Sequence, residues 1–141
     1  MDKKVTSIKE IKSILLLALL LNALFLSAQT TVNDVRVEFK LDEESSTLIP
    51  DVLFKINVSD TAQIDKIIIT LGTTSGGSEY FSYTINANGS NLPQGLTLNV
   101  SANSIIINTG SRSGVVQYHG SAKLLYRDGT YSPLKTVTNI Q

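Results

Sequence analysis

The sequence predicts an all-β protein: one antiparallel sandwich of about seven to eight strands, preceded by a short apolar helix. Two observations carry this prediction. Apolar and polar residues alternate with a period of two along most of residues 30–141, as expected for half-buried strands. Turns rich in glycine, asparagine and serine separate these runs at short intervals, which favours a sandwich or a small barrel. Residues 30–141 are enough for one hydrophobic core and too few for two.

The N-terminus has the pattern of a secretory signal peptide. Four lysines lie within residues 1–13, the apolar run Ile14–Leu26 follows, and small or polar residues occupy 27–29. The run is shorter than the roughly 20 residues that a membrane-spanning helix needs. We therefore expect residues 1–29 to be removed, by cleavage after Ala28 or Gln29, and residues 30–141 to form the exported domain. The Ser-Ala-Gln ending resembles signal peptides of Gram-negative bacteria and indicates a periplasmic or cell-surface protein.

Eight strand-like runs follow in order. Most have an apolar face at alternate positions, such as Val52, Phe54 and Ile56 in the second run, and residues 64–71 are a more continuous apolar run. Asp128-Gly129, between the last two runs, predicts a type I′ hairpin with positive φ at both central residues. The expected strands are residues 32–40, 52–58, 64–71, 80–86, 96–100, 105–107, 115–127 and 130–140.

Composition excludes several function classes. The chain has no cysteine, which rules out disulfides, a lipidated N-terminal cysteine and cysteine-based zinc or redox sites. Residues 30–141 carry eight lysines and arginines against ten aspartates and glutamates. A near-neutral domain lacks the clustered basic face that nucleic acid or an anionic membrane surface requires. We therefore expect neither partner, and no stable membrane insertion after cleavage.

The C-terminal stretch from Tyr118 to Ser132 resembles the last two strands of fibronectin type III and bacterial immunoglobulin-like domains. An aromatic residue opens the penultimate strand, small and apolar residues alternate, and an Asp-Gly turn leads to a serine or threonine. The resemblance implies an immunoglobulin-like sandwich in which Tyr118 acts as a tyrosine corner, its hydroxyl bonding the backbone of a preceding loop. The tryptophan and the cysteine pair found in many such domains are missing.

No residue set demands a particular chemistry. His119, Ser121 and Asp128 could be imagined as a triad, but they share one hairpin with no nucleophile elbow and no implied cleft. The acidic run Asp42-Glu43-Glu44 has oxygen ligands suited to calcium but lacks the spacing of an EF-hand loop. We therefore expect no enzyme activity, no catalytic residues, no metal site and no cofactor.

Tyrosines are the remaining candidates for a binding surface. Tyr83, Tyr118 and Tyr126 are in phase with core positions, whereas Tyr80 and Tyr131 are expected to be exposed. Asp60-Thr61-Ala62 resembles a short bacterial O-glycosylation motif, which makes Thr61 a hypothetical glycan site. Three Asn-x-Ser sequons, at Asn57, Asn88 and Asn99, are read as coincidence in a sequence rich in asparagine and serine.

Two function hypotheses follow. The first is an exported, non-enzymatic binding or structural module that joins a cell-envelope or surface assembly through strand edges or loops, with an envelope protein as partner. The second is a solitary domain that binds carbohydrate or another ligand, which predicts an exposed aromatic patch or a concave face. The absence of tryptophan counts against the second hypothesis.

Overall fold

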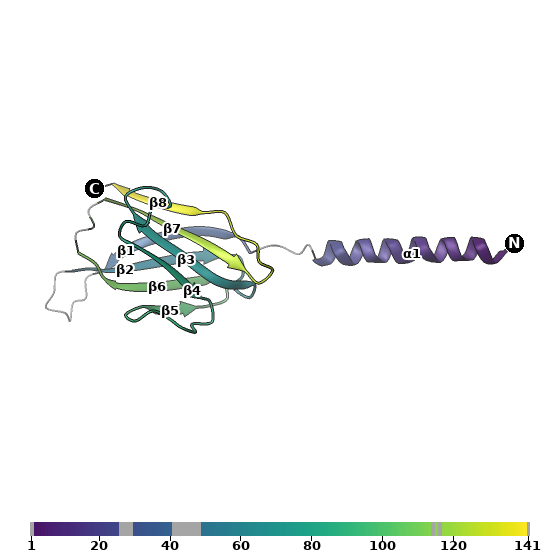
Figure 1. Ribbon diagram of the computed structural model, residues 1–141, viewed down its shortest axis with the longest axis horizontal. Coiled ribbons are helices and arrows are strands. Elements are labelled where there is room, and N and C mark those ends of the chain that lie inside the picture. Colours follow the sequence, from purple (N-terminus) through teal and green to yellow (C-terminus); the bar gives the residue numbers. More distant parts are fainter. Residues whose placement is uncertain (1, 26–29, 41–48, 114, 116, 141) are drawn as a thin grey trace.

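The computed structural model describes residues 2–25, 30–40, 49–113, 115 and 117–140 (Figure 1). An N-terminal helix, α1 (Asp2–Phe25), precedes eight β-strands. Side chains 7–20 of α1 are exposed throughout, including Ile14 at 67% and Leu19 at 65%. Among the described residues, no helix has both the length and the apolar character needed to cross a bilayer. An exposed apolar helix outside the folded part is consistent with the expected signal peptide.

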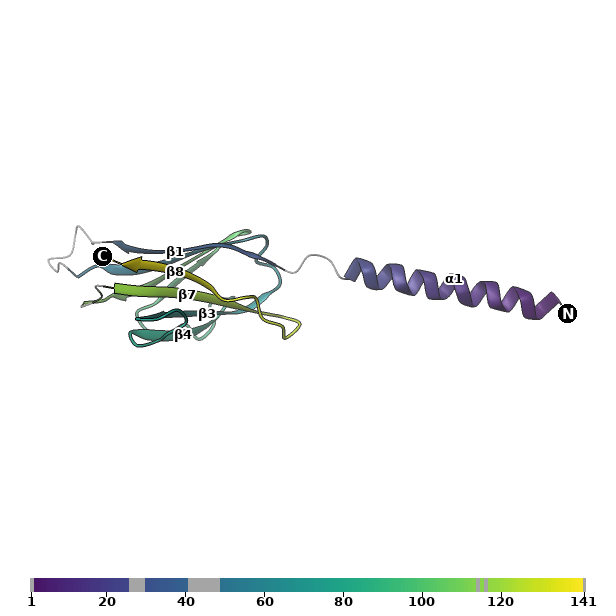
Figure 2. The ribbon, with the colours of Figure 1, turned by 90° about the horizontal axis from the view of Figure 1, so that it is seen from above.

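The strands form two four-stranded antiparallel sheets that pack face to face, which confirms the predicted sandwich (Figures 1 and 2). The first sheet has the order β1-β2-β6-β5 and the second β4-β3-β7-β8. The strands are β1 (Val32–Lys40), β2 (Asp51–Val58), β3 (Ile64–Gly72), β4 (Phe81–Asn86), β5 (Thr97–Val100), β6 (Ser104–Ser111), β7 (Gln117–Tyr126) and β8 (Lys135–Ile140).

The core lies between the two sheets and is built by the alternation seen in the sequence. Every second residue of the central strands is buried, because successive side chains of a strand point to opposite faces. Phe54 and Ile56 of β2 and Ile67 and Ile69 of β3 are fully buried. The other fully buried apolar side chains are Val52, Val58, Leu71, Ile85, Ile105, Ile107, Ala122 and Leu124.

The hairpin between β7 and β8 differs from the prediction. The Tyr126 amide donates to the Thr130 carbonyl and the Gly129 amide to the Tyr126 carbonyl. Gly129 has a φ of 86°, whereas Asp128 is not among the residues with positive φ. A type I′ turn is therefore wrong: this is a three-residue loop with a type I turn and a bulged glycine.

The last strand begins at Lys135 and not at residue 130. Leu125 bridges Tyr131, and regular pairing resumes only where Ala122 faces Lys135. Pro133 lies in the gap and has no amide hydrogen to give to the ladder. The Leu124 amide donates instead to the Ser132 hydroxyl at 2.9 Å, so a side chain takes the place of a backbone acceptor there.

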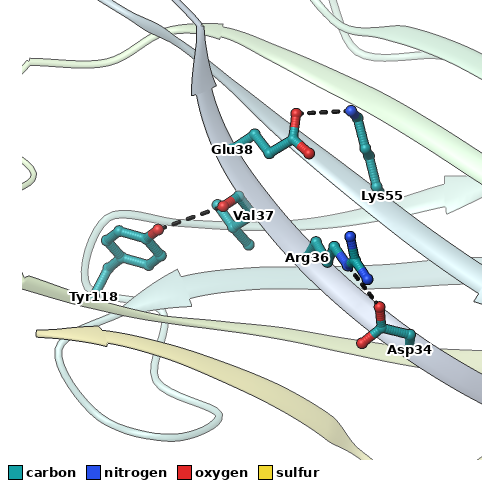
Figure 3. Close-up of polar contacts among 6 residues, drawn as sticks. All are labelled: Asp34, Arg36, Val37, Glu38, Lys55 and Tyr118. Atoms are coloured by element: carbon teal, nitrogen blue, oxygen red, sulfur yellow. Dashed lines mark hydrogen bonds and ion pairs between the residues drawn. The ribbon is translucent and has the colours of Figure 1, made fainter.

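Strand β1 folds against the second sheet along one side of the sandwich. The Tyr118 hydroxyl of β7 donates to the Val37 carbonyl of β1 at 3.4 Å (Figure 3). This bond reaches a strand of the opposite sheet, whereas the expected tyrosine corner would bond the backbone of a preceding loop. Gly120 permits this approach: a Cβ there would lie 2.4 Å from the Val37 Cγ2. β1 also contacts β8 (Figure 2), so this side of the sandwich is closed.

Candidate functional site

The structure does not bring the three triad candidates together. His119 shares a 2.9 Å contact between its Nδ1 and the Thr138 Oγ1. Ser121 is buried and accepts from the Gly76 amide at 3.0 Å. Asp128 lies in the β7–β8 turn, where the hydroxyl and amide of Thr130 hold the pKa of its carboxyl below the usual value. These contacts stabilise the turns and the sheet.

No cluster that could hold a metal ion occurs among the described residues. The acidic run Asp42-Glu43-Glu44 lies outside those residues. The Thr61 hydroxyl, the proposed glycan acceptor, donates to the Ser101 carbonyl at 2.7 Å. A glycan on that oxygen would remove the donated hydrogen, so this contact and the modification exclude one another.

The tyrosines follow the predicted phase with one correction. Tyr118 and Tyr126 are buried, Tyr83 is half-buried, and Tyr131 is exposed at 53%. Tyr80 was expected to be exposed, but it is half-buried against the core, and its hydroxyl donates to the Gln117 carbonyl at 3.2 Å. Of the two tyrosines expected to be exposed, only Tyr131 is, so they do not form an exposed aromatic surface together.

Three of the four sheet edges have features that discourage pairing with another chain. β1 alternates charged residues, has a register shift between Val32 and Asp34, and forms two ion pairs (Figure 3). β8 lies beside β1, and β5 is only four residues long. Charges, bulges, covered edges and short strands are the usual means by which proteins protect an edge.

Within the described residues, the fourth edge, β4, has none of these protections. Its sequence Phe-Ser-Tyr-Thr-Ile-Asn contains no charged residue and no proline, and its pairing with β3 is regular. β4 lies at the border of its sheet, on the side away from β8 (Figure 1). The sequence did not predict this site, because the strand order decides which strand lies at an edge, and the residue pattern within one strand does not reveal that order.

Alternation of the hydrogen bonds shows which backbone groups are open. Ala87 follows β4 in the same register, and its amide donates to the carbonyl of Asp65 in β3 at 2.9 Å. In an antiparallel pair the bonded positions recur every second residue. Ser82 and Thr84 therefore direct their amides and carbonyls away from β3, to the open edge, and their side chains are exposed.

Arg112 lies beside this edge, on the side facing the core. Its guanidinium carbon is 5.1 Å from the centre of the Phe81 ring and 6.0 Å from that of Tyr83. Its Nη2 donates to the Tyr83 hydroxyl at 2.6 Å and to the Thr109 carbonyl at 3.3 Å. The buried Nε has no acceptor among the described residues.

Neither of the ion pairs within the described parts of the chain includes Arg112. We call the open backbone of Ser82 and Thr84, together with Phe81, Tyr83 and Arg112, the β4 edge site. It combines unpaired strand backbone, aromatic surface and a cation without a carboxylate among the described residues. Such a site can add an extended peptide to the sheet.

A polar cavity of about 470 Å³ lies at one end of the sandwich. Asp65, Asn86, Asn88 and Arg127 contribute polar side chains to its lining, and Val100 contributes apolar surface. This combination can hydrogen-bond hydroxyl groups, although its described lining contains no aromatic ring.

Comparison with known proteins identifies no relative. No protein family matches the chain, and neither a curated protein nor a solved structure is significantly similar to it.

Proposed function

We propose that this protein is an exported, non-enzymatic binding module of a bacterial cell-envelope or surface assembly, and that it holds its protein partner by strand addition. The observation that carries the proposal is the open, uncharged edge of β4. Main-chain hydrogen bonds from Ser82 and Thr84 would supply the attachment, and neighbouring side chains would select the partner.

The strand order supports placing the sandwich in the immunoglobulin-like class. In constant-type immunoglobulin domains the strands A, B, E and D form one sheet and C, F and G the other. Chain order maps β1, β2, β6 and β5 onto the first set, and β3, β7 and β8 onto the second. β4 is then the added strand next to C, and this added strand carries the open edge.

Export is the second part of the proposal. α1 has a lysine-bearing start and exposed leucines, and residues 30 and 31 already bond to the sandwich. The Tyr126 hydroxyl donates to the Thr30 carbonyl, and the Thr31 amide donates to the Ser59 hydroxyl. Cleavage after Ala28 or Gln29 would leave both contacts intact. The mass of the protein isolated from the envelope tests this, since an uncleaved chain would contradict it.

The binding function is tested by affinity purification of the tagged protein from its native envelope with two variants of one residue. Ser82→Pro removes an outward amide that β3 does not use, so the fold tolerates it as an edge proline. Ser82→Thr keeps that amide and serves as the control. We expect a stoichiometric partner with the wild type and Ser82→Thr, and about tenfold less with Ser82→Pro, about 1.4 kcal/mol. Equal recovery with both variants would refute strand addition at β4.

The polar cavity favours a second candidate, carbohydrate binding. Asp65 and Arg127 place a carboxylate and a guanidinium around a space of about 470 Å³, which suits the hydroxyl groups of a small sugar. A glycan array probed with the wild type and with Asp65→Ala tests this role. A signal that the substitution leaves unchanged would exclude this cavity as the sugar site.

A further inference from the structure

Resting on the proposed binding function, we propose that the β4 edge site selects a partner strand that carries an aspartate or glutamate on its core-facing side, opposite Arg112. Two independent observations lead to this inference. One is the open edge of β4, which takes an extended segment. The other is the guanidinium beside that edge, which has no carboxylate partner within the described residues.

The geometry places the two features within reach of each other. A strand added to β4 would lie about 4.8 Å from it, and its core-facing side chains would stand beside Phe81 and Tyr83. Arg112 packs on these same two rings, at 5.1 and 6.0 Å. A core-facing carboxylate of the added strand, opposite Phe81 or Tyr83, can therefore reach the guanidinium.

The chemistry of Arg112 favours a carboxylate over a neutral group. A guanidinium has five N–H donors in a planar fork, and it cannot lose its charge. The hydrogen bonds that Arg112 makes to described side chains and carbonyls use Nη2, which leaves Nε and Nη1 without acceptors in that part of the chain. Because Nε is buried, a carboxylate of the docked strand would accept a charge-assisted hydrogen bond from Nη1. Neutral acceptors would leave the charge uncompensated as the docked strand excludes water.

A second copy of this chain is a poor occupant of the same edge. Self-pairing would place β4 against β4, and β4 contains no acidic residue to meet Arg112. The remaining positions of the partner strand face exposed Ser82 and Thr84 or the rings, so small polar and apolar residues suit them. The expected partner is thus another protein with an extended segment that is uncharged apart from this carboxylate.

The test begins with photo-crosslinking of the full chain in its native envelope. A photoreactive residue replaces Ser82 on β4, Asn99 on β5 or Arg36 on β1, and mass spectrometry maps the crosslinked segment. We expect capture from Ser82 alone, of one segment that contains an aspartate or glutamate. Capture only from β1 or β5, or capture of a second copy, would overturn the inference and leave a protein-binding function standing. Absence of any crosslink would overturn both.

The charge requirement is then measured with the mapped segment as a synthetic peptide. The acidic peptide and its amide counterpart (Asp→Asn or Glu→Gln) are titrated against the protein purified from the envelope and against its Arg112→Gln variant. We expect the acidic peptide to bind the wild type at least tenfold more tightly, and the difference to fall below about threefold in Arg112→Gln, which has no charge at that position. Equal affinities of both peptides for the wild type would overturn the proposed carboxylate contact while leaving strand addition intact.

Discussion

The absence of a side chain at Gly120 allows β1 to pack closely against β7. Its position on β7 faces Val37, and a Cβ there would lie 2.4 Å from the Val37 Cγ2. We expect Gly120→Ala to lower the free energy of unfolding by about 1–3 kcal/mol through overpacking. Urea denaturation of the purified protein measures this change. In a Val37→Ala background the clash is relieved, so the same substitution should cost less; an equal cost there would contradict the packing explanation.

Ser132 provides a side-chain substitute for a missing ladder bond. It is buried, and its hydroxyl accepts from the Leu124 amide at 2.9 Å where Pro133 interrupts the β7–β8 pairing. Ser132→Ala leaves that amide without its partner, which should lower the free energy of unfolding by about 1–3 kcal/mol. Ser132→Thr keeps the hydroxyl and should lose less. Thermal or urea unfolding of the two variants compares them, and equal stability of Ser132→Ala and the wild type would exclude this role.

At the scale of elements, Asp51 links the start of β2 to the end of β6. Its carboxylate accepts from Asn108 at 2.9 Å and from the Ser111 hydroxyl at 2.7 Å, and these bonds lower its pKa from the ordinary 3.8. The unfolded chain therefore binds a proton more readily than the folded one. This stabilisation is present above about pH 3.8 and is lost as the pH falls through the lower folded pKa.

Denaturation at a series of acidic pH values tests this link between β2 and β6. The wild type should lose stability below about pH 3.8 more steeply than Asp51→Asn, which has no proton to gain at that position. Identical slopes for the two proteins would show that Asp51 makes no contribution to the acid sensitivity of the fold.

Elements with an uninterrupted alternating pattern could be predicted from the sequence. β1 has the predicted bounds, and β2, β3 and β4 differ by a single residue at one end, because their apolar faces all pack against the core between the sheets. The predicted start of β8 was too early, because Pro133 interrupts the backbone pairing there and the Ser132 side chain accepts from Leu124 instead. The hairpin type was wrong because Asp-Gly also suits a type I turn with a bulged glycine, and only the pairing of Tyr126 with Thr130 distinguishes them.

At the scale of the whole molecule, the candidate site depends on contacts between distant segments. Arg112 follows β6 in one sheet, whereas Phe81 and Tyr83 belong to β4 in the other. No local pattern around Arg112 reveals these neighbours, because the sheet order brings them together. The expectation that binding would use strand edges could be made from sequence, but the particular edge could not.

The proposed export involves the whole chain and would depend on the apolar surface of α1. A charged residue in the middle of the Ile14–Leu26 run should prevent its recognition as a signal peptide. We expect Leu17→Arg to retain the full-length chain inside the cell, whereas Lys12→Arg keeps the positive start and is processed normally. Cell fractionation with intact-mass measurement distinguishes the two. Normal processing of Leu17→Arg would argue against a signal-peptide role for α1.

The position of the first and last strands has a mechanical consequence. β1 and β8 lie side by side, while the start of β1 and the end of β8 are at opposite ends of the sandwich (Figures 1 and 2). Tension applied through Val32 and Ile140 would act along the strands, across hydrogen bonds that run perpendicular to them. The β1–β2 and β7–β8 ladders would then be loaded in shear, with all their bonds sharing the force. A domain of this geometry would resist being pulled apart between two anchored partners, and single-molecule stretching through these two residues would show a higher rupture force than stretching through Val32 and Lys135.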